Sequence, residues 1–416
     1  MKKFAIYRNG LRFLSIYLGF SIISIAIILF LFSSSKSTLE EDIKIQTEND
    51  ITSISNVFLE ELSQLSTDIF LITDLINVHD SIIINNGSSE FTSGDSKAII
   101  ETEFLVWLGM KDAYDQIRFI DNTGQEIIRV NANNGSPYIV EDSELQNKAS
   151  RYYFSEAIIL DDRDLYMSVL DLNVENGEIE MIDDSPKPML RLATPLFDKD
   201  GVKLGIVIVN YLAENLFETL DITEETLHST IEIINESGYY LYTKDESLEF
   251  GFMYDNLLEE KFSKYHDYDV FSISSGEIVS EKYEDGYYTT IRLSSSELTD
   301  AANESGSSNI NIVFGSKEFI IFTELNLNTN TAYKNMRTLY ISLAIASLVV
   351  GLILTRLIDE SIHLNRENIK RMKYDSLNDL LTTLPNRKSI NEHIQNLLQR
   401  KKAFTLLSLT LMDSRM

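Results

Sequence analysis

The sequence predicts an α+β membrane protein in which two transmembrane helices bracket an outer domain of helices and antiparallel strands. Two long uncharged apolar runs occur among the 416 residues, at 13–32 and 338–355. Between them, short strand patterns alternate with turns. The apolar content of 44% excludes wholesale disorder, and the absence of cysteine excludes disulfides and thiolate metal sites.

The first apolar run, residues 13–32, is long enough to cross a bilayer. At about 1.5 Å per helical residue it spans the roughly 30 Å of a hydrocarbon core. A buried core helix is disfavoured, because residues 1–12 hold four basic residues and no acid. A cleaved signal peptide is the rival interpretation, but the run exceeds the usual signal core of about 7 to 15 residues. We predict an uncleaved anchor here and a second span at 338–357.

Charge predicts the orientation of the chain. Residues 356–416 carry eleven Lys or Arg against seven Asp or Glu, so residues 1–12 and 356–416 together carry +8. The whole chain carries −28, which leaves −36 on residues 33–337. Basic flanks stay in the cytoplasm, so both termini are expected inside a plasma membrane and 33–337 outside. Nucleic acid is not expected as a partner, because phosphate binding needs a basic surface.

A long helix begins the outer domain. Apolar residues recur there in steps of three and four, which marks one stripe of a helix. The stripe consists of Ile51, Ile54, Phe58, Leu62, Leu65, Ile69, Ile72 and Ile76.

Beyond a predicted loop at 85–96, the pattern changes to strands and turns. Residues 114–131 predict a hairpin with NTG at its turn, and helices are predicted at 143–160 and 211–220. The other predicted strands are at 165–170, 189–197, 203–210, 229–243, 268–273, 287–293, 310–314 and 318–324. The simplest arrangement is two modules, at about 80–220 and about 221–330.

Several stretches resemble the double Cache sensor domains of bacterial receptors, including "YDQIRFID", "LQNKASRYYFSEA" and "KPMLRLATPLFDKDGVKLGIVIVNY". The resemblance covers most of residues 35–330 and is specific in the first, membrane-distal module. It implies PAS-like modules outside a bacterial inner membrane, a homodimer, and a small-molecule ligand in the distal module.

The resemblance also implies a pocket. Amino-acid-binding members use an R-x-W-Y motif, which Arg151, Tyr153 and Phe154 partly match. An arginine fork suits a carboxylate, and rings enclose apolar carbons. Those members end the last pocket strand with Asp, where this chain has Asn210. An amide cannot neutralise an ammonium, which argues against an α-amino acid and leaves other carboxylates open.

Other residues are candidates for the same pocket. Tyr166, Asp171 and Arg191 complete the predicted set, while Arg118 and Arg129 compete with Arg151 as anion contacts. The alternative for these arginines is surface ion pairs worth about 0 to 1 kcal/mol each. Trp107, the one tryptophan, is expected in the core.

Residues 358–378 predict a signalling helix. Ile358, Ile362, Ile369 and Met372 form a stripe that suits a parallel coiled coil between two copies, or an ordinary amphipathic linker. Next, "DLLTTLPNR" at 379–387 resembles the D-x-L-T-x-L-x-N-R opening of GGDEF diguanylate cyclase domains, which are α/β enzymes that convert two GTP to cyclic di-GMP. Residues 379–416 are therefore predicted to be the start of such a domain.

The resemblance implies that this start is inactive. The family's first strand carries a metal-binding Asp where this chain has Thr410, and hard cations need charged oxygens. We therefore predict no catalytic residue, metal site or cofactor in this chain, although an intact parent would use Mg²⁺. One base deleted from DNA encoding D-L-D-G-F-K-N-V yields residues 410–416 and a stop codon, so we expect a frameshift.

Three functions remain open from the sequence. The first is a ligand sensor derived from a diguanylate cyclase whose catalytic domain is cut off. The second is a receptor subunit without enzymatic output that partners intact cyclases. The third is the sensor of a histidine kinase-type system, although His363 lacks the acidic neighbour and the following proline of a phosphoacceptor box.

Overall fold

The computed structural model describes residues 2–400, apart from 80, 86, 133–135, 176–177, 183–184, 228, 305–309 and 317. The chain divides into two compact units. Thr38–Lys334 forms the central unit, and Met1–Ser37 with Asn335–Met416 forms the terminal unit. The predicted cyclase strand with Thr410 lies outside the described residues.

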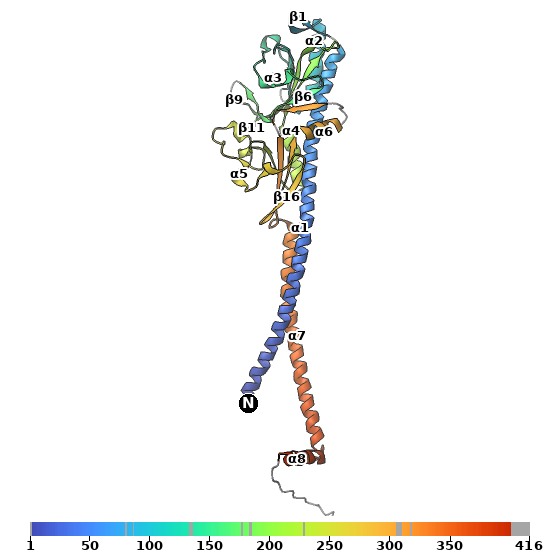
Figure 1. The fold of residues 1–416 in the computed structure, drawn as a ribbon, viewed down its shortest axis with the longest axis vertical. Helices are drawn as coiled ribbons and strands as arrows, with labels where there is room; N and C mark the ends of the chain where they lie inside the picture. The colour runs from blue at the N-terminus through green and yellow to red at the C-terminus, as the bar shows by residue number, and fades with distance from the viewer. Residues whose placement is uncertain are drawn as a thin grey trace, which may run out of the picture. The chain divides into compact units, whose positions relative to one another are not determined.

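One helix, α1 (Lys2–His79), supplies the core of the central unit. All eight residues of the predicted stripe are at most 3% exposed, which confirms the prediction. Figure 1 shows α1 running past the strands of two sheets. Residues from both sheets and from α1 form a single apolar cluster.

The larger sheet has eight strands. Its path is β18-β6-β12-β13-β3-β4-β5, with β7 paired to β12. The strands are β3 (Tyr114–Asp121), β4 (Glu126–Asn131), β5 (Tyr138–Ile139), β6 (Asp164–Met167), β7 (Asp171–Leu172), β12 (Pro188–Phe197), β13 (Lys203–Leu212) and β18 (Asn311–Phe314). The predicted 114–131 hairpin is confirmed as β3 and β4, with Gly124 at a φ of 88° in its turn.

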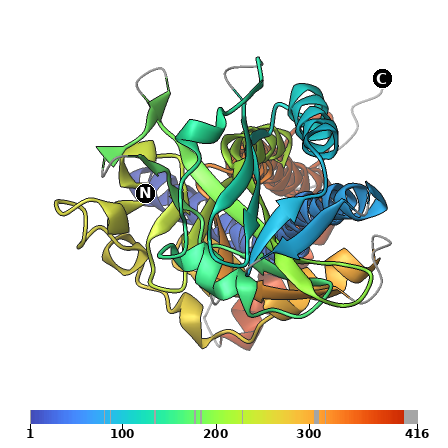
Figure 2. The same cartoon turned by 90° about the horizontal axis from the view of Figure 1, so that it is seen from above.

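Helices cover both faces of this sheet. α1 and α2 (Gly94–Met110) share the apolar cluster of one face, and α3 (Tyr152–Ile158) packs on the other. Figure 2 shows this arrangement from above. The predicted helix at 143–160 is thus shorter, with a separate 3₁₀ turn at Asp142–Glu144.

The smaller sheet has five strands in the order β15-β14-β19-β17-β16. They are β14 (Thr230–Asn235), β15 (Tyr240–Tyr242), β16 (Ile278–Tyr283), β17 (Gly286–Ser294) and β19 (Glu318–Asn326). α4 (Glu214–Leu227) connects β13 to β14. α5 (Phe262–Tyr265) packs on the outer face, and α6 (Ser295–Glu304) follows β17.

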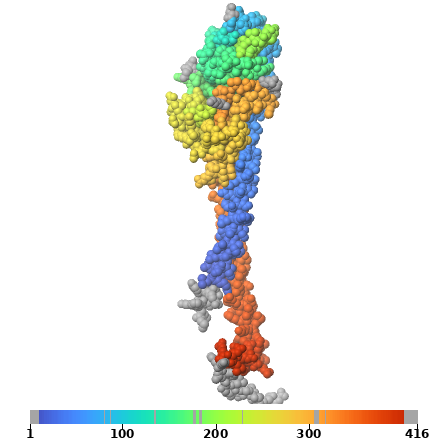
Figure 3. All heavy atoms as spheres, viewed as in Figure 1, coloured from blue at the N-terminus to red at the C-terminus, as the bar shows by residue number. Residues whose placement is uncertain are grey.

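The strand predicted at 310–314 forms, but it joins the larger sheet. β18 pairs in parallel with β6, from Asn311 opposite Asp164 to Phe314 opposite Met167. Ile310 and Ile312 are buried there in the main apolar cluster. In Figure 3 the orange atoms of this part of the chain border the green atoms of the larger sheet. The chain then returns to the smaller sheet as β19.

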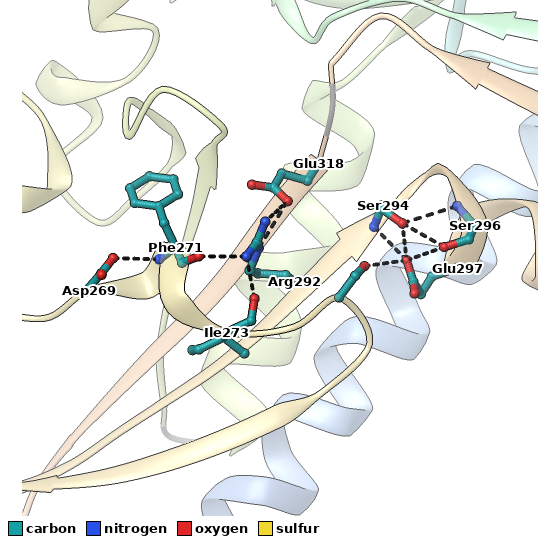
Figure 4. Close-up of polar contacts among 9 residues, drawn as sticks. Asp269, Phe271, Ile273, Arg292, Ser294, Ser296, Glu297 and Glu318 are labelled. Atoms are coloured by element: carbon teal, nitrogen blue, oxygen red, sulfur yellow. Dashed lines mark hydrogen bonds and ion pairs between the residues drawn. The ribbon is translucent and has the colours of Figure 1, made fainter.

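The strand predicted at 268–273 is wrong. Val270–Ser272 is a 3₁₀ turn, and its surroundings explain why. Arg292 donates through Nη1 to the carbonyl of Phe271 at 2.8 Å and to the carbonyl of Ile273, and it pairs with Glu318 (Figure 4). A side chain therefore satisfies carbonyls that a neighbouring strand would otherwise occupy.

Other local differences follow from short-range signals. The predicted loop at 85–96 contains β2 (Ser88–Phe91), paired with β1 (Ile82–Asn85), and the first residues of α2. α6 begins with a capping box, in which the Ser294 amide donates to Glu297 Oε2 at 2.8 Å (Figure 4). The remaining short strands are β8 (Val174–Glu175), β9 (Glu178–Ile179), β10 (Met181–Ile182) and β11 (Ser185–Pro186).

The terminal unit consists of the first part of α1, most of α7 (Thr331–Leu377) and α8 (Arg387–Gln399). α1 and α7 are both long and apolar enough to cross a membrane by length and composition. Within this unit, Arg12 forms an ion pair with Asp359. Phe32 and Tyr340 pack edge to face, with ring centroids 5.4 Å apart.

Replacing Phe58 by alanine tests the shared core. Phe58 is fully buried, and its ring centroid lies 4.9 Å from that of Phe319 on β19. We expect Phe58→Ala to lower the free energy of unfolding by about 3 to 5 kcal/mol, because a large cavity remains. Denaturant unfolding of the full chain in detergent measures this. Leu71→Ala, on the same helix but 48% exposed, should cost far less.

Candidate functional site

Buried polar side chains gather on the face of the larger sheet that α3 covers. Arg118 on β3, Arg191 on β12 and Asn210 on β13 lie on this face, since Arg191 is paired with Asn210 and Arg118 with Ile208 across the strands. Each of the three is at most 5% exposed. A buried charge is stable only when it is paired and hydrogen-bonded, so the partners of these groups decide what the site can do.

Arg191 is held by three neighbouring side chains. It donates to Asp171 Oδ1 at 2.7 Å, to Asn173 Oδ1 at 2.9 Å and to the Tyr152 hydroxyl at 3.3 Å. Burial raises the pKa of Asp171 and outweighs the opposing effect of Arg191. The pair is therefore a closed ion pair within the site.

Arg118 forms a second centre next to it. The guanidinium donates to the Tyr153 hydroxyl at 3.1 Å and to Asn210 Oδ1 at 2.9 Å. Glu126, whose side chain is fully buried, balances the charge at 3.6 Å between Oε1 and Arg118 Nη1. Burial favours the neutral Tyr153 hydroxyl, but the charge and hydrogen bond of Arg118 prevail and lower its pKa.

The network extends to Lys187, a residue that the sequence analysis did not select. Lys187 pairs with Asp115 at 2.7 Å and with Glu180 at 3.1 Å. Asn173 links it to Arg191, because Asn173 donates to Glu180 at 2.6 Å while it accepts from Arg191. No local motif marks these residues, since strands distant in the sequence bring them together.

The structure separates the predicted pocket residues into three groups. Tyr153, Asp171, Arg191 and Asn210 belong to the polar network described above. Phe154 and Tyr166 are buried in the apolar cluster beneath α3.

Arg151 is the remaining member and lies exposed at the N-terminus of α3. Its guanidinium carbon is 5.8 Å from the centroid of the Tyr153 ring. It has no ion pair with any residue that the structure describes. Arg129 is different, because it lies 3.8 Å from Glu126. Trp107 is half-buried against the main core.

A separate hollow, here called the acidic groove, lies between α4 and the segment from β15 to α5. Its volume is about 1490 Å³. The carboxylates that line it from α4 are Glu214, Glu218, Asp221, Glu224 and Glu225. Glu246, Glu249 and Glu260 line it from the facing segment, where burial raises the pKa of Glu249 to about 8.

Comparison with known proteins identifies the fold. Residues 60–267, half of the chain, match the family described as bacterial histidine kinase, sensor domain. The chain belongs to this family. The sensor-domain match covers the polar network, α3 and all lining residues of the acidic groove. It ends before residues 379–387, so the cyclase opening stays a prediction. No curated protein matches the chain in sequence.

The first two of the following three solved structures show the same sensor-domain fold. The extracellular domain of vpHK1S-Z8, named as a histidine kinase, aligns at 18% identity and a TM-score of 0.51, over 70% of this chain and 94% of that one. A domain of a sensory box/GGDEF family protein from Vibrio parahaemolyticus also aligns at 18% and 0.51, over 69% of this chain and 97% of that domain. The ligand-binding domain of the Pseudomonas aeruginosa PAO1 amino acid chemoreceptor PctC, solved with GABA, aligns at 11% and 0.41, over 67% and 99%.

Substituting Arg191 tests the closed ion pair. We expect Arg191→Met to lower the free energy of unfolding by about 2 to 4 kcal/mol, because Asp171, whose side chain is 18% exposed, loses its partner in a mostly buried site. Arg163→Met is the control, since it breaks an exposed pair with Asp74 that is worth at most about 1 kcal/mol. Denaturant unfolding of both variants measures the difference. Equal costs would show that the network is not an energetic unit.

The raised pKa of Glu249 predicts a pH-dependent stability. The folded protein holds the proton that the unfolded chain releases near its ordinary value of 4.5. This contribution is complete below about pH 4.5 and is lost as the pH rises towards about 8. The melting temperature of Glu249→Gln minus that of the wild type should therefore increase as the pH rises from 5 to 8. Glu246→Gln, which changes an exposed residue of the same groove, is the matched control. An equal increase of the melting-temperature difference in this variant would contradict the assignment to Glu249.

Proposed function

We propose that this protein is a membrane receptor whose central unit binds a small molecule outside the membrane and signals to the cytoplasm through α7. The observation that carries the proposal is the buried polar network under α3, in a chain of the bacterial sensor-domain family. Candidate spans on α1 and α7 precede and follow that unit in the sequence.

The proposed ligand contacts are Arg151, Tyr153, Phe154, Tyr166, Asp171, Arg191 and Asn210. Arg191 is neutralised by Asp171, and Arg118 by Glu126. Arg151 is then the cation at the rim that can pair with an anionic ligand group. Asp171 is held by Arg191, and Asn210 accepts from Arg118. Neither is free to hold an ammonium, so we favour a carboxylate ligand without an α-ammonium group.

The proposed membrane arrangement places 13–32 and 338–357 in a bacterial inner membrane, with 33–337 outside and both ends in the cytoplasm. The four basic residues at 1–12 and the eleven Lys or Arg at 356–416 support this orientation. α7 continues without interruption to Leu377, which gives the signal a continuous helix. Ile358, Ile369 and Met372 are exposed apolar residues on it, which supports the proposal of a homodimer through 358–378.

A cyclase-type output is a second proposal, supported by the turn at 379–387. Asp379 Oδ1 accepts hydrogen bonds from the Leu381 amide at 3.1 Å and from the Thr382 amide and hydroxyl at 3.0 Å each. Asn386 caps α8 by accepting from the Ser389 amide at 3.0 Å. This ordering suits the structural role of the D-x-L-T-x-L-x-N-R opening.

The output has two alternatives, a non-enzymatic subunit that partners intact cyclases and a histidine kinase-type system. An intact cyclase parent would use Mg²⁺. Sequencing the gene beyond codon 416 separates the proposals. A GGDEF coding sequence in another frame supports the frameshift, and its absence from all frames contradicts it.

The ligand proposal is tested by a thermal-shift screen of the full chain in detergent against organic acids and amino acids. For a carboxylate that stabilises the protein, we expect Arg151→Ala to weaken binding by about 10- to 100-fold, because charge-assisted hydrogen bonds are lost. Titration calorimetry measures the affinity. Arg163→Ala removes an exposed arginine that pairs with α1 and should have no effect. Unchanged affinity in Arg151→Ala would refute the pocket.

A further inference from the structure

The acidic groove has a charge that the protein itself leaves uncompensated. Glu260 pairs with Lys264, and Glu249 holds its proton near neutral pH because burial raises its pKa to about 8. None of the other six carboxylates forms an ion pair with a residue that the structure describes. Lys244 is the only other basic residue in the lining. Like charges this close repel one another, so the groove favours a cationic occupant.

The carboxylates of α4 are arranged in a line. Glu214, Glu218, Asp221 and Glu225 follow one another in steps of four, three and four, which places them on one face of the helix. The eleven residue steps from Glu214 to Glu225 extend about 16 Å along the helix. Within the described chain, no group of three or more His, Asp or Glu side chains is placed to hold a metal ion. Charge spread along a line suits a linear polycation better than a single ion.

The floor of the groove adds an independent apolar component. Phe217 lies beside Tyr242 and Phe250, with ring centroids 5.4 and 6.3 Å apart. Aromatic faces attract ammonium groups and pack against methylene chains. A metal ion has no methylene groups to pack against these rings, so the rings favour an organic cation.

Thr243 provides a further observation that points to a ligand. It lines the groove and is only 6% exposed. Its amide donates to Glu249 Oε1 at 2.9 Å, but its hydroxyl has no hydrogen-bond partner in the described part of the chain. The hydroxyl oxygen is not among the enclosed polar atoms that lack a partner, so it opens onto the groove and can bond an occupant.

We propose that the acidic groove is a second binding site, specific for a linear aliphatic polyamine. Its ammonium groups pair with the carboxylates of α4 and with Glu246 on the facing segment, and its methylenes lie on the rings of Phe217 and Tyr242. α4 connects β13 of the larger sheet to β14 of the smaller sheet, so an occupied groove ties these two strands together. This site is separate from the carboxylate pocket under α3.

The test is titration calorimetry of the full chain in detergent with spermidine as the probe. We expect saturable binding at one site per chain, weakened by added salt. Glu218→Gln with Glu225→Gln should weaken it by about tenfold or more. The control, Glu141→Gln with Glu144→Gln, removes the same charge from an exposed turn and should leave the affinity unchanged. Equal losses in both double variants would overturn the proposal, since binding would then follow net charge alone.

Two further measurements distinguish the polyamine site from a divalent-cation site and from the carboxylate pocket under α3. Mg²⁺ at the same concentration should not displace spermidine, and displacement would overturn the proposal in favour of a divalent-cation site. Arg151→Ala should leave spermidine binding intact while it weakens binding of a carboxylate. Failure of one proposal therefore leaves the other standing. Loss of spermidine binding in Arg151→Ala would contradict the separation of the two sites.

Discussion

The structure depends on the packing of one helical stripe against two sheets. The stripe residues of α1 are buried, and the apolar cluster that contains them includes strands of both sheets. Burial of apolar area contributes about 25 cal/mol per Å², so a shared helix makes the stability of each sheet depend on the other. Polar contacts fix the register of this packing. Tyr211 donates to Glu61 at 2.9 Å, and Tyr114 donates to Asp68.

On the opposite face of the larger sheet, buried ion pairs lie beside the apolar cluster that α3 covers. Arg118, Arg191 and Lys187 are buried, and each has an acidic partner. Such pairs contribute little net stability compared with apolar groups of the same size, but breaking one is costly. They hold the polar groups of this face in fixed positions. Among the arginines of this face that the structure describes, Arg118 and Arg191 have acidic partners, whereas Arg151 has no ion pair.

Features that depend on local periodicity could be predicted from the sequence. The stripe of α1, the 114–131 hairpin and strands β12 and β13 follow from spacing and turn residues. The partners of these elements could not be predicted, because pairing across distant strands leaves no local signal. Thus Asn210 and Arg191 were candidates, but their bonds to Arg118 and Asn173 were not foreseen. The turn at 270–272 was misassigned because a distant side chain, Arg292, takes its carbonyls. The S-x-x-E signal at 294–297 was present in the sequence and would have located α6.

Because β18 returns to the larger sheet late in the sequence, this sheet cannot be completed early in synthesis. The larger sheet begins at residue 114, but its edge beside β6 is covered by residues 311–314. During synthesis the ribosome must therefore add more than a hundred residues after β13 before that edge is closed. An open edge with free amides and carbonyls is a template for pairing with other chains. A chimaeric receptor joined between the two sheets would leave this edge bare, whereas a junction after β19 would keep the first sheet whole.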